Sequence, residues 1–201
     1  LSLMAERPNI CNQIHMPLQA GNDRILHKMN RTYTKQEFLD LVKETRDIIP
    51  DIAISTDIII GFPTETDEEF NDTIDVVKTV QFDSAFIFKY SERPNTRAAQ
   101  KFPDDVDESI KKSRIIKLND IQNKISLEKN KALIGSNQEI LIEELQTKRS
   151  NLEMQGRTDC NRIVILPKNL NQKIGDFVTA KITDATRNIL KGTLEKTKKA
   201  N

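Results

Sequence analysis

The chain has few cysteines and no long apolar run, and these two shortages exclude several classes of protein. Cys11 and Cys160 lie 149 positions apart, so they form no metal-ligand pair by spacing and no disulfide framework. We expect both to be small core or surface residues. No apolar run approaches the roughly 20 residues of a membrane span, and the start, LSLMAERPN, lacks the shape of a signal peptide. We therefore expect a protein of the cytoplasm that has no contact with a membrane.

The net charge is also small, at +1 over 201 residues, and by itself it points to no polyanionic partner. The charge is unevenly placed, however. Residues 135–201 carry 12 lysines and arginines against 8 aspartates and glutamates, whereas residues 1–134 carry 19 against 22. A solvated lysine-rich face explains this modest excess as well as a nucleic acid partner does. The first residue is Leu1 rather than Met, as expected for a piece of a longer protein.

In residues 1–134, apolar segments alternate with amphipathic ones, in the order strand, helix, strand, helix, strand, helix. Strands are expected at 10–18, 52–63 and 82–90, and helices at 23–29, 34–49, 66–80 and about 106–133. Two of the helices begin with capping boxes, Thr34 with Glu37 and Thr66 with Glu69. The alternation predicts parallel strands with right-handed crossovers. Because only three strands are present, we interpret this α/β part as the latter half of a barrel or doubly wound sheet.

After Gly135 the pattern changes to short segments with partial alternation. Five strands separated by turn residues are expected, at 138–145, 151–158, 161–167, 176–186 and 189–196. They predict a small antiparallel barrel, so we place the domain boundary between residues 1–134 and 135–201. Small barrels with a basic excess often bind nucleic acids.

The segment HMPLQAGNDRILHKMNR, residues 15–31, runs from the first strand into a helix through a break at Gly21. Such strand-to-helix turns can gather backbone N–H groups and polar side chains around a ligand, which makes Gln19, Gly21, Asn22 and Asp23 candidates for a site. The alternative is structural. Gly21 would then make a tight turn, and Asn22 or Asp23 would cap the helix.

Four motifs in order give a resemblance to a known family. HMPLQAGNDRILHKMNR is similar to H-x-P-x-Q-S-G-S-D-x-x-L-x-x-M-x-R, TDIIIGFPTET to D-x-I-V-G-F-P-G-E-T, and FKYSERPNTRAA to Y-S-x-R-x-G-T-x-A, while GRTDCNRIV lies within the expected barrel. Together they resemble the MiaB-like methylthiotransferases, a branch of the radical S-adenosylmethionine (radical SAM) enzymes. The resemblance implies a partial (β/α) radical SAM barrel followed by an OB-like TRAM domain that engages RNA.

The resemblance also implies roles for individual residues. Gln19, Gly21 and Asn22 would face the ribose or amino-acid part of S-adenosylmethionine, and the adenine would lie near Ile59 and Gly61, where a glycine lets backbone atoms approach.

Several side chains in these motifs have two readings each. Arg31 would reach the carboxylate of the cofactor, or form an ordinary surface salt bridge. Glu65 would orient the strand-end loop or cap the helix that starts at residue 66. Arg93, on the same rim, would contact substrate or be merely solvated.

The chain departs from the family in two ways. The smaller departure is a set of substitutions: Ala20 and Asn22 stand where the family has serines, and Thr64 and Asn95 where it has glycines. Threonine tolerates positive φ poorly, so the loop at 63–66 could differ. The larger departure is the absence of the C-x-x-x-C-x-x-C motif, whose three thiolates hold a [4Fe–4S] cluster and leave one iron for S-adenosylmethionine. The resemblance implies two [4Fe–4S] clusters in the parent protein, with ligands outside this chain. No catalytic or metal-ligating residue is therefore assigned here, and the chain alone is expected to be inactive.

By similarity, the parent enzyme would convert the isopentenylated adenosine beside the tRNA anticodon to its 2-methylthio form, with a reductant for the cluster as a further partner. The alternatives are a methylthiotransferase acting on threonylcarbamoyl-adenosine tRNA or on a ribosomal protein, and, from another class, a non-catalytic RNA-binding protein. For contact with the anticodon stem-loop, the expected residues are Lys148, Arg149, Arg157 and Arg162; a solvated barrel rim is the plain alternative.

Overall fold

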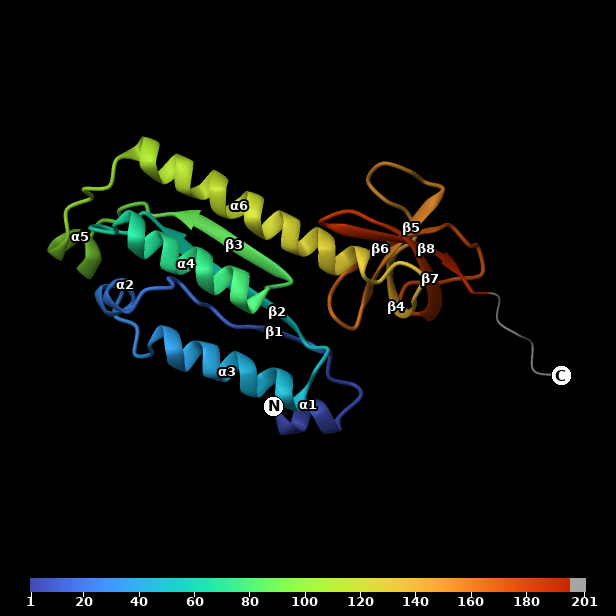
Figure 1. The fold of residues 1–201 in the computed structure, drawn as a ribbon. Coiled ribbons are helices and arrows are strands. Elements are labelled where there is room, and N and C mark those ends of the chain that lie inside the picture. Colours follow the sequence, from blue (N-terminus) through green and yellow to red (C-terminus); the bar gives the residue numbers. More distant parts are fainter. Residues whose placement is uncertain (196–201) are drawn as a thin grey trace. The chain divides into compact units, whose positions relative to one another are not determined.

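The computed structural model describes residues 1–195, which form two compact units. The first unit comprises Leu1–Glu6 and Ile14–Ile125, and the second comprises Arg7–Gln13 and the chain from Ser126 onward. The elements appear in Figure 1. The first unit contains α1 (Ser2–Glu6), β1 (Gln13–His15), α2 (Asp23–Lys28), α3 (Lys35–Ile48), β2 (Ala53–Ile60), α4 (Asp67–Val80), β3 (Ser84–Lys89), α5 (Arg97–Lys101) and most of α6 (Glu108–Lys131).

The three strands of the first unit form a sheet in the order β1-β2-β3. β2 and β3 pair in parallel over six residue pairs, from Ser55 with Ser84 to Ile60 with Lys89. Beyond the end of β1, Gln19 adds a parallel bridge to Ile58. The predicted parallel arrangement is confirmed, and the carboxyl ends of β2 and β3 lie at the same edge of the sheet, which the chain after β1 approaches through Gln19.

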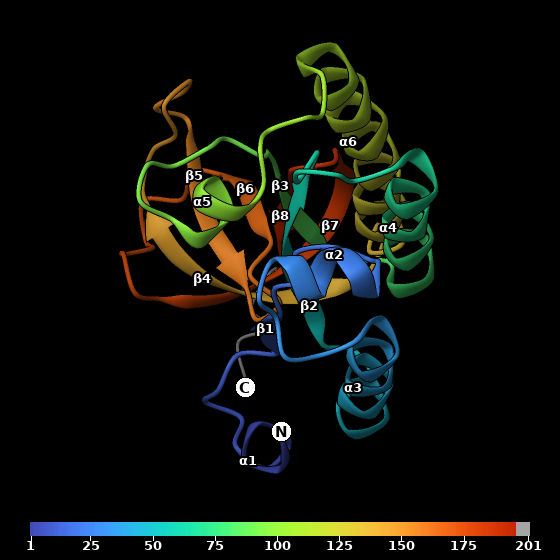
Figure 2. The ribbon, with the colours of Figure 1, turned by 90° about the vertical axis from the view of Figure 1, so that its left-hand side faces the viewer.

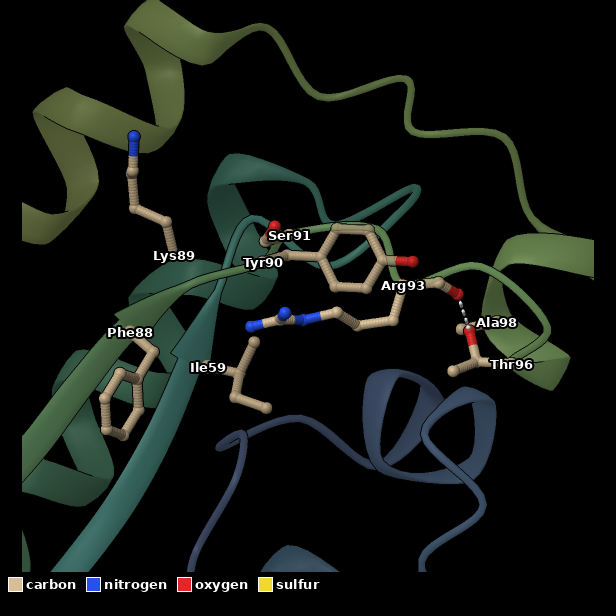
Figure 3. Close-up of a pocket in the computed structure, with 8 residues that line it drawn as sticks. All are labelled: Ile59, Phe88, Lys89, Tyr90, Ser91, Arg93, Thr96 and Ala98. Carbon is tan, nitrogen blue, oxygen red and sulfur yellow. Dashed lines mark hydrogen bonds between the residues drawn. The ribbon is translucent and has the colours of Figure 1, made fainter.

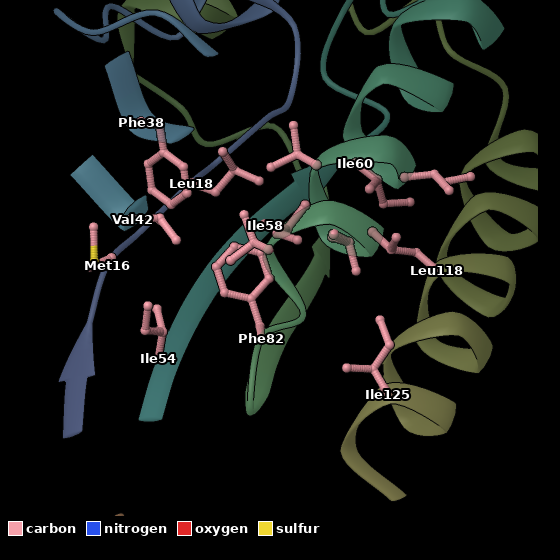
Figure 4. Packing of buried hydrophobic residues seen from close by; sticks show 14 of the residues in the cluster. Met16, Leu18, Phe38, Val42, Ile54, Ile58, Ile60, Phe82, Leu118 and Ile125 are labelled. Carbon is pink, nitrogen blue, oxygen red and sulfur yellow. The ribbon is translucent and has the colours of Figure 1, made fainter. Parts of the chain in front are cut away.

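Alternating residues of β2 separate a covered face from an open one. Ile54, Ile58 and Ile60 are fully buried, and they belong to one hydrophobic cluster with Phe38 of α3 and Leu118 of α6 (Figure 4). Each such side chain contributes roughly 1.5–3 kcal/mol by leaving water. The opposite face carries Phe86 and Phe88 of β3, which are 56% and 53% exposed. Helices therefore cover only one side of the sheet.

Both predicted capping boxes are present. The hydroxyl groups of Thr34 and Thr66 accept the N–H groups of Glu37 and Glu69, whose carboxylates in turn accept the cap N–H groups. These reciprocal bonds satisfy donors that a helix start leaves unpaired. The helices begin where the sequence predicts.

The first strand is shorter than predicted. β1 spans only Gln13–His15 within the expected 10–18, because Pro17 has no N–H to donate and the N–H of Leu18 donates to the Thr56 hydroxyl (2.9 Å) instead of a ladder carbonyl. The short helices α1 and α5 were not predicted from the sequence. Figures 1 and 2 place α5 with α2 at one end of the sheet.

The second unit holds a closed barrel of five strands in the order β4-β5-β6-β8-β7. The strands are β4 (Asn137–Glu144), β5 (Glu153–Thr158), β6 (Ile163–Pro167), β7 (Phe177–Ala185) and β8 (Ile189–Leu194). The prediction of five strands is confirmed, except that Lys196, the last residue of the expected fifth strand, lies outside the described residues.

The expectation of a purely antiparallel barrel is wrong at one place. β6 and β8 pair in parallel, from Ile163 with Ile189 to Ile165 with Lys191, whereas the other four pairs are antiparallel. A closed ring with an odd number of strands cannot alternate direction all the way round. One parallel pair is therefore the minimum.

Candidate functional site

A pocket of about 370 Å³ opens where β2 and β3 end (Figure 3). We call it the strand-end pocket. Its lining comes from both strand ends and from the segment after β3, and includes Ile59, Phe88, Tyr90, Ser91, Arg93 and Thr96. The volume falls in the range of small-molecule sites, and the carboxyl ends of parallel strands are where α/β proteins bind ligands.

Tyr90 and Arg93 bring polar groups to this pocket. In Figure 3 the Arg93 side chain extends along the pocket, below the Tyr90 ring and toward Ile59, and the Thr96 hydroxyl donates to the Arg93 carbonyl (2.9 Å). The Tyr90 hydroxyl is buried and has no hydrogen-bond partner among the described residues. Burial raises the pKa of Tyr90, so this hydroxyl stays protonated and can donate to a ligand. Arg93 lines this pocket, while its expected contact with substrate stays a prediction.

The turn after β2 is held by close contacts around Gly61. Its φ of +66° lies in the left-handed region, and a Cβ there would sit 2.4 Å from Cγ of Lys111. Lys111 is itself buried, with Nζ bonded to both carboxylate oxygens of Asp104. Only glycine satisfies both the backbone angle and the space at this position.

Glu65 orients this turn and does not cap the helix that follows. Its Oε2 accepts the N–H of Gly61 (2.7 Å) and Nη1 of Arg114 (2.8 Å), whereas the N-cap of α4 is Thr66. The capping interpretation is therefore wrong. Burial raises the pKa of Glu65, although the Gly61 N–H and the Arg114 guanidinium act in the opposite direction.

The two residues that replace family glycines keep a glycine-like backbone. Thr64 has φ of 69° and Asn95 has φ of 68°. Around Thr64 the strain is offset by contacts: its N–H donates to Asp105 (2.6 Å), and its hydroxyl accepts from Arg24 (3.0 Å) and Lys28. The loop at 63–66 therefore adopts left-handed φ despite the substitution.

The turn after β1 contains the buried Gln19, Gly21 in close contact with α4, and the N-cap of α2. Gln19 is buried with φ of 64°, and Asn22 is the N-cap of α2, as the structural interpretation predicts. At Gly21 a Cβ would lie 2.5 Å from Cα of Thr73 in α4. The glycine is therefore required by helix packing, while the roles of all three residues toward a cofactor stay predictions.

Arg31 is exposed and lines a second pocket of about 250 Å³, apart from the strand-end pocket. Lys28, Arg97 and Lys101 line the same space. We call it the basic pocket. No ion pair of Arg31 is present among the described residues, so the surface salt bridge considered above is not formed there.

The four barrel cations differ in their surroundings. Lys148 and Arg149 are exposed in the loop between β4 and β5. Arg157 pairs with Glu143 (3.0 Å) and donates to Asn161 (2.8 Å), and Nε of Arg162 donates to Asn130 (3.0 Å). The expected contact of these residues with RNA stays a prediction.

Neither a metal cluster nor a membrane-spanning helix is found in the part of the chain that the structure describes. No group of three or more histidine, cysteine, aspartate or glutamate side chains there is placed to hold a metal, and no helix there is long and apolar enough to cross a bilayer. Cys11 and Cys160 form no disulfide within residues 1–195.

Sequence reasoning missed Tyr90, Lys111 and Arg114. Lys111 and Arg114 contact residues distant in the sequence, Gly61 and Glu65 respectively. The sequence did offer one indication for two of them. Lys111 and Arg114 are three positions apart on α6, and this spacing places them on the same face of the helix.

Two family models match the chain. The radical SAM superfamily matches residues 1–77, and the TRAM domain matches residues 131–194.

Curated relatives resemble nearly the whole chain. The tRNA-2-methylthio-N(6)-dimethylallyladenosine synthase of Phocaeicola vulgatus is 43% identical over 96% of this chain and 42% of its own length. The synthase of the same name from Porphyromonas gingivalis is 44% identical over 98% of this chain and 42% of its own. The chain thus spans about two fifths of the length of these relatives.

Among solved structures, the chain resembles coproporphyrinogen III oxidase of Escherichia coli, described as a radical SAM enzyme. The TM-score is 0.50 at 16% identity, over 89% of this chain and 44% of that one. At this identity the likeness concerns the fold alone.

Proposed function

The chain is a MiaB-like segment, part of a radical SAM barrel followed by a TRAM domain, and from this premise we propose that its parent protein methylthiolates tRNA. The reaction is insertion of sulfur and a methyl group at C2 of an N6-isopentenyl (dimethylallyl) adenosine next to the anticodon. The observation that carries the proposal is the identity of about 43% to synthases of this name across 96% of the chain.

The strand-end pocket is proposed to bind S-adenosylmethionine together with the target base. Three features support this: its volume of about 370 Å³, the apolar side chain of Ile59, and the buried Tyr90 hydroxyl, which has no hydrogen-bond partner in the described part of the chain. When bound beside a reduced cluster, this cofactor supplies the radical that removes a hydrogen atom from the substrate. The protein binds, orients and excludes water.

Within this proposal, the chain's residues divide into contact and shaping roles. Ile59 packs on the adenine, and the turns at Gln19 and Gly61 present backbone atoms to the cofactor. Gly21 and Asn22 shape the first turn through α4 and α2. Arg93 contacts the substrate from the rim. For Arg31 to reach the carboxylate of the cofactor, that end of the cofactor would have to extend out of the strand-end pocket toward the pocket that Arg31 lines.

The chain's own residues do not fit an iron–sulfur cluster. Its two cysteines are too far apart in sequence to supply three closely spaced thiolates. The proposal therefore assigns the ligands of both clusters to parts of the protein outside this chain, and it includes an external reductant and a cytoplasmic location. Reading the gene upstream of Leu1 for C-x-x-x-C-x-x-C tests this assignment directly.

The barrel is proposed to bind the anticodon stem-loop through Lys148, Arg149, Arg157 and Arg162. The match to the TRAM domain supports RNA binding, and Lys148 and Arg149 are the cations of this set exposed in a loop. Arg157 and Arg162 contribute less, since both already have protein partners.

The test uses the protein at its full natural length, with its clusters reconstituted without oxygen. It is incubated with tRNA bearing isopentenyl-adenosine, with tRNA bearing threonylcarbamoyl-adenosine, and with ribosomal proteins. Mass spectrometry of nucleosides and peptides should find the methylthio group on the first substrate. A methylthio group on either rival substrate would replace the proposed specificity, and RNA binding without any product from the reconstituted protein would favour the non-catalytic alternative.

A further inference from the structure

The basic pocket, lined by Lys28, Arg31, Arg97 and Lys101, gathers positive charge without acidic neighbours. It lies between the end of α2 and α5, and no aspartate or glutamate lines it. Figure 2 shows α2 and α5 at the same end of the first unit. Four cations around about 250 Å³ repel one another, and this arrangement favours an anion.

The charges are not neutralised by groups around the pocket. Among the described residues, Arg31, Arg97 and Lys101 form no ion pair, and Lys28 donates to the Thr64 hydroxyl and lies 4.9 Å from the centroid of the Phe102 ring.

Nearby carboxylates are engaged elsewhere. Asp104 binds Lys111, Asp105 accepts the N–H of Thr64, and Glu69 binds Arg24. None of these three carboxylates forms an ion pair with a cation that lines the basic pocket, although Asp105 keeps its negative charge because a neutral N–H does not compensate it. The lining of the pocket itself is therefore positively charged.

The basic pocket adjoins the strand-end pocket through a shared segment. Arg93, Thr96 and Ala98 line the strand-end pocket, whereas Arg97 and Lys101 line the basic pocket. Because residues 93–101 border both pockets, a nucleotide whose base entered the strand-end pocket would hold its phosphates close to this segment.

We propose that the basic pocket binds backbone phosphates of the RNA, next to the nucleotide whose base enters the strand-end pocket. The inference rests on the proposed function and adds an RNA contact on the first unit to the one on the barrel. Arginine can bind a phosphate through two N–H groups, and lysine adds a point charge. These contacts would fix the position of the target base without reading its sequence.

The first test compares salt dependence of RNA binding. R97Q/K101Q is compared with the wild type and with K78Q/K112Q, which removes two exposed lysines from α4 and α6. The protein has its full natural length, and the probe is an isopentenylated anticodon stem-loop. Arg31 is left unchanged because the cofactor is expected to use it. Two lost contacts should reduce the slope of log K against log salt by about 1.4, at about 0.7 for each contact on single-stranded RNA. An R97Q/K101Q slope equal to that of K78Q/K112Q would overturn the inference.

A second test locates the contact on the RNA. Single phosphates around the target adenosine are replaced by uncharged methylphosphonates. One or two of these replacements should weaken binding to the wild type and have little effect on R97Q/K101Q, because the partner cations are already gone. Equal weakening in both proteins at every position would contradict the inference.

The failure of this inference is distinguishable from failure of the proposed function. If the wild type shows no salt-dependent binding to the stem-loop, the proposed function fails. A different outcome refutes only the phosphate contact on the first unit. In that outcome the wild type binds the stem-loop and K148Q/R149Q weakens this binding, but R97Q/K101Q behaves like K78Q/K112Q.

Discussion

Arg114 of α6 donates to both the carboxylate and the main-chain carbonyl of Glu65, at 2.8 and 3.2 Å. Both side chains are almost fully buried. Through Glu65, which also accepts the N–H of Gly61, the long helix α6 fixes the turn at the strand-end pocket. A residue 49 positions away in the sequence thus holds the backbone of the site.

R114M should destabilise the first unit strongly, because it leaves the Glu65 carboxylate buried without its counter-charge. Removing one partner of a buried pair typically costs about 3–5 kcal/mol. Urea unfolding of R114M and of the control K112M, an exposed position on the same helix, measures the difference. R114M/E65Q should recover part of the loss, and equal stability of R114M and K112M would contradict the assigned role.

G61A should cost more than the backbone angle alone. Left-handed φ costs a non-glycine residue about 1–2 kcal/mol, and the added methyl would also overlap the stem of Lys111. We expect a total loss of about 2–4 kcal/mol. G135A is the matched control, since Gly135 has φ of +91° with nothing within 4 Å of an added Cβ. Equal losses in the two variants would show that the contact with Lys111 has no effect.

G21A tests packing instead of backbone angle. The added Cβ would meet main-chain atoms of α4, Cα of Thr73 at 2.5 Å and the carbonyl of Asp72 at 2.7 Å, so no side chain can move aside. We expect a loss of about 3 kcal/mol or more, measured by chemical denaturation. N22A, which removes only the cap of α2, should cost about 1 kcal/mol. A G21A loss no larger than that of N22A would contradict the close-packing argument.

The pair of Glu69 with Arg24 should make stability depend on pH. Hydrogen bonds from Arg24 hold the pKa of Glu69 below its ordinary value of 4.5. A lowered pKa in the folded state means that the pair stabilises above the unfolded pKa, and that this contribution is lost as the pH falls through the folded value. Because the Arg24 side chain is 46% exposed, E69Q should cost only about 1–2 kcal/mol near neutral pH.

Thermal unfolding of the wild type and E69Q across pH 3–7 checks this dependence. The difference in stability should shrink toward the acid end of this range. E68Q, a neighbouring exposed glutamate in the first turn of α4, changes the net charge equally. If the stability difference between the wild type and E69Q does not shrink at low pH, the pair of Glu69 with Arg24 is not the source of that difference.

The barrel cations should contribute unequally to RNA binding. K148Q/R149Q should lower the slope of log K against log salt by about 1.4, because both side chains are exposed. R157Q should change the slope less, since Glu143 already pairs with Arg157. Fluorescence anisotropy with an anticodon stem-loop at several salt concentrations measures both slopes. A larger effect of R157Q than of K148Q/R149Q would reverse the assignment.

Local sequence signals predicted most of the elements. The capping boxes at Thr34 and Thr66, the β-branched run before Gly61 and the five barrel strands are all confirmed, because caps, alternation and breakers act within a few residues. The ordered motifs also predicted the family, which the comparisons confirm. The prediction that the domains divide at residue 135 remains a prediction.

Features that depend on distant contacts could not be predicted in this way. The left-handed φ of Thr64 needs Asp105, Arg24 and Lys28, and the spacing of Gly21 from α4 needs the assembled fold. The parallel pair of β6 and β8 follows from ring closure and not from the pattern of either strand. Tertiary context decides such features, and a single sequence does not display it.

If each position of β2 were randomised in turn, the number of tolerated replacements would alternate from one residue to the next in the second half of the strand. Under selection for folding alone, Ile54, Ile58 and Ile60, which face the helices, would accept few replacements, whereas Asp57 and Ile59, which are partly open to solvent, would accept many. This alternation would end at Gly61, where the φ angle of +66° disfavours nearly every other residue. Variation that leaves folding intact is therefore expected at Asp57 and Ile59, and not at Ala53 and Ser55, which are buried as well.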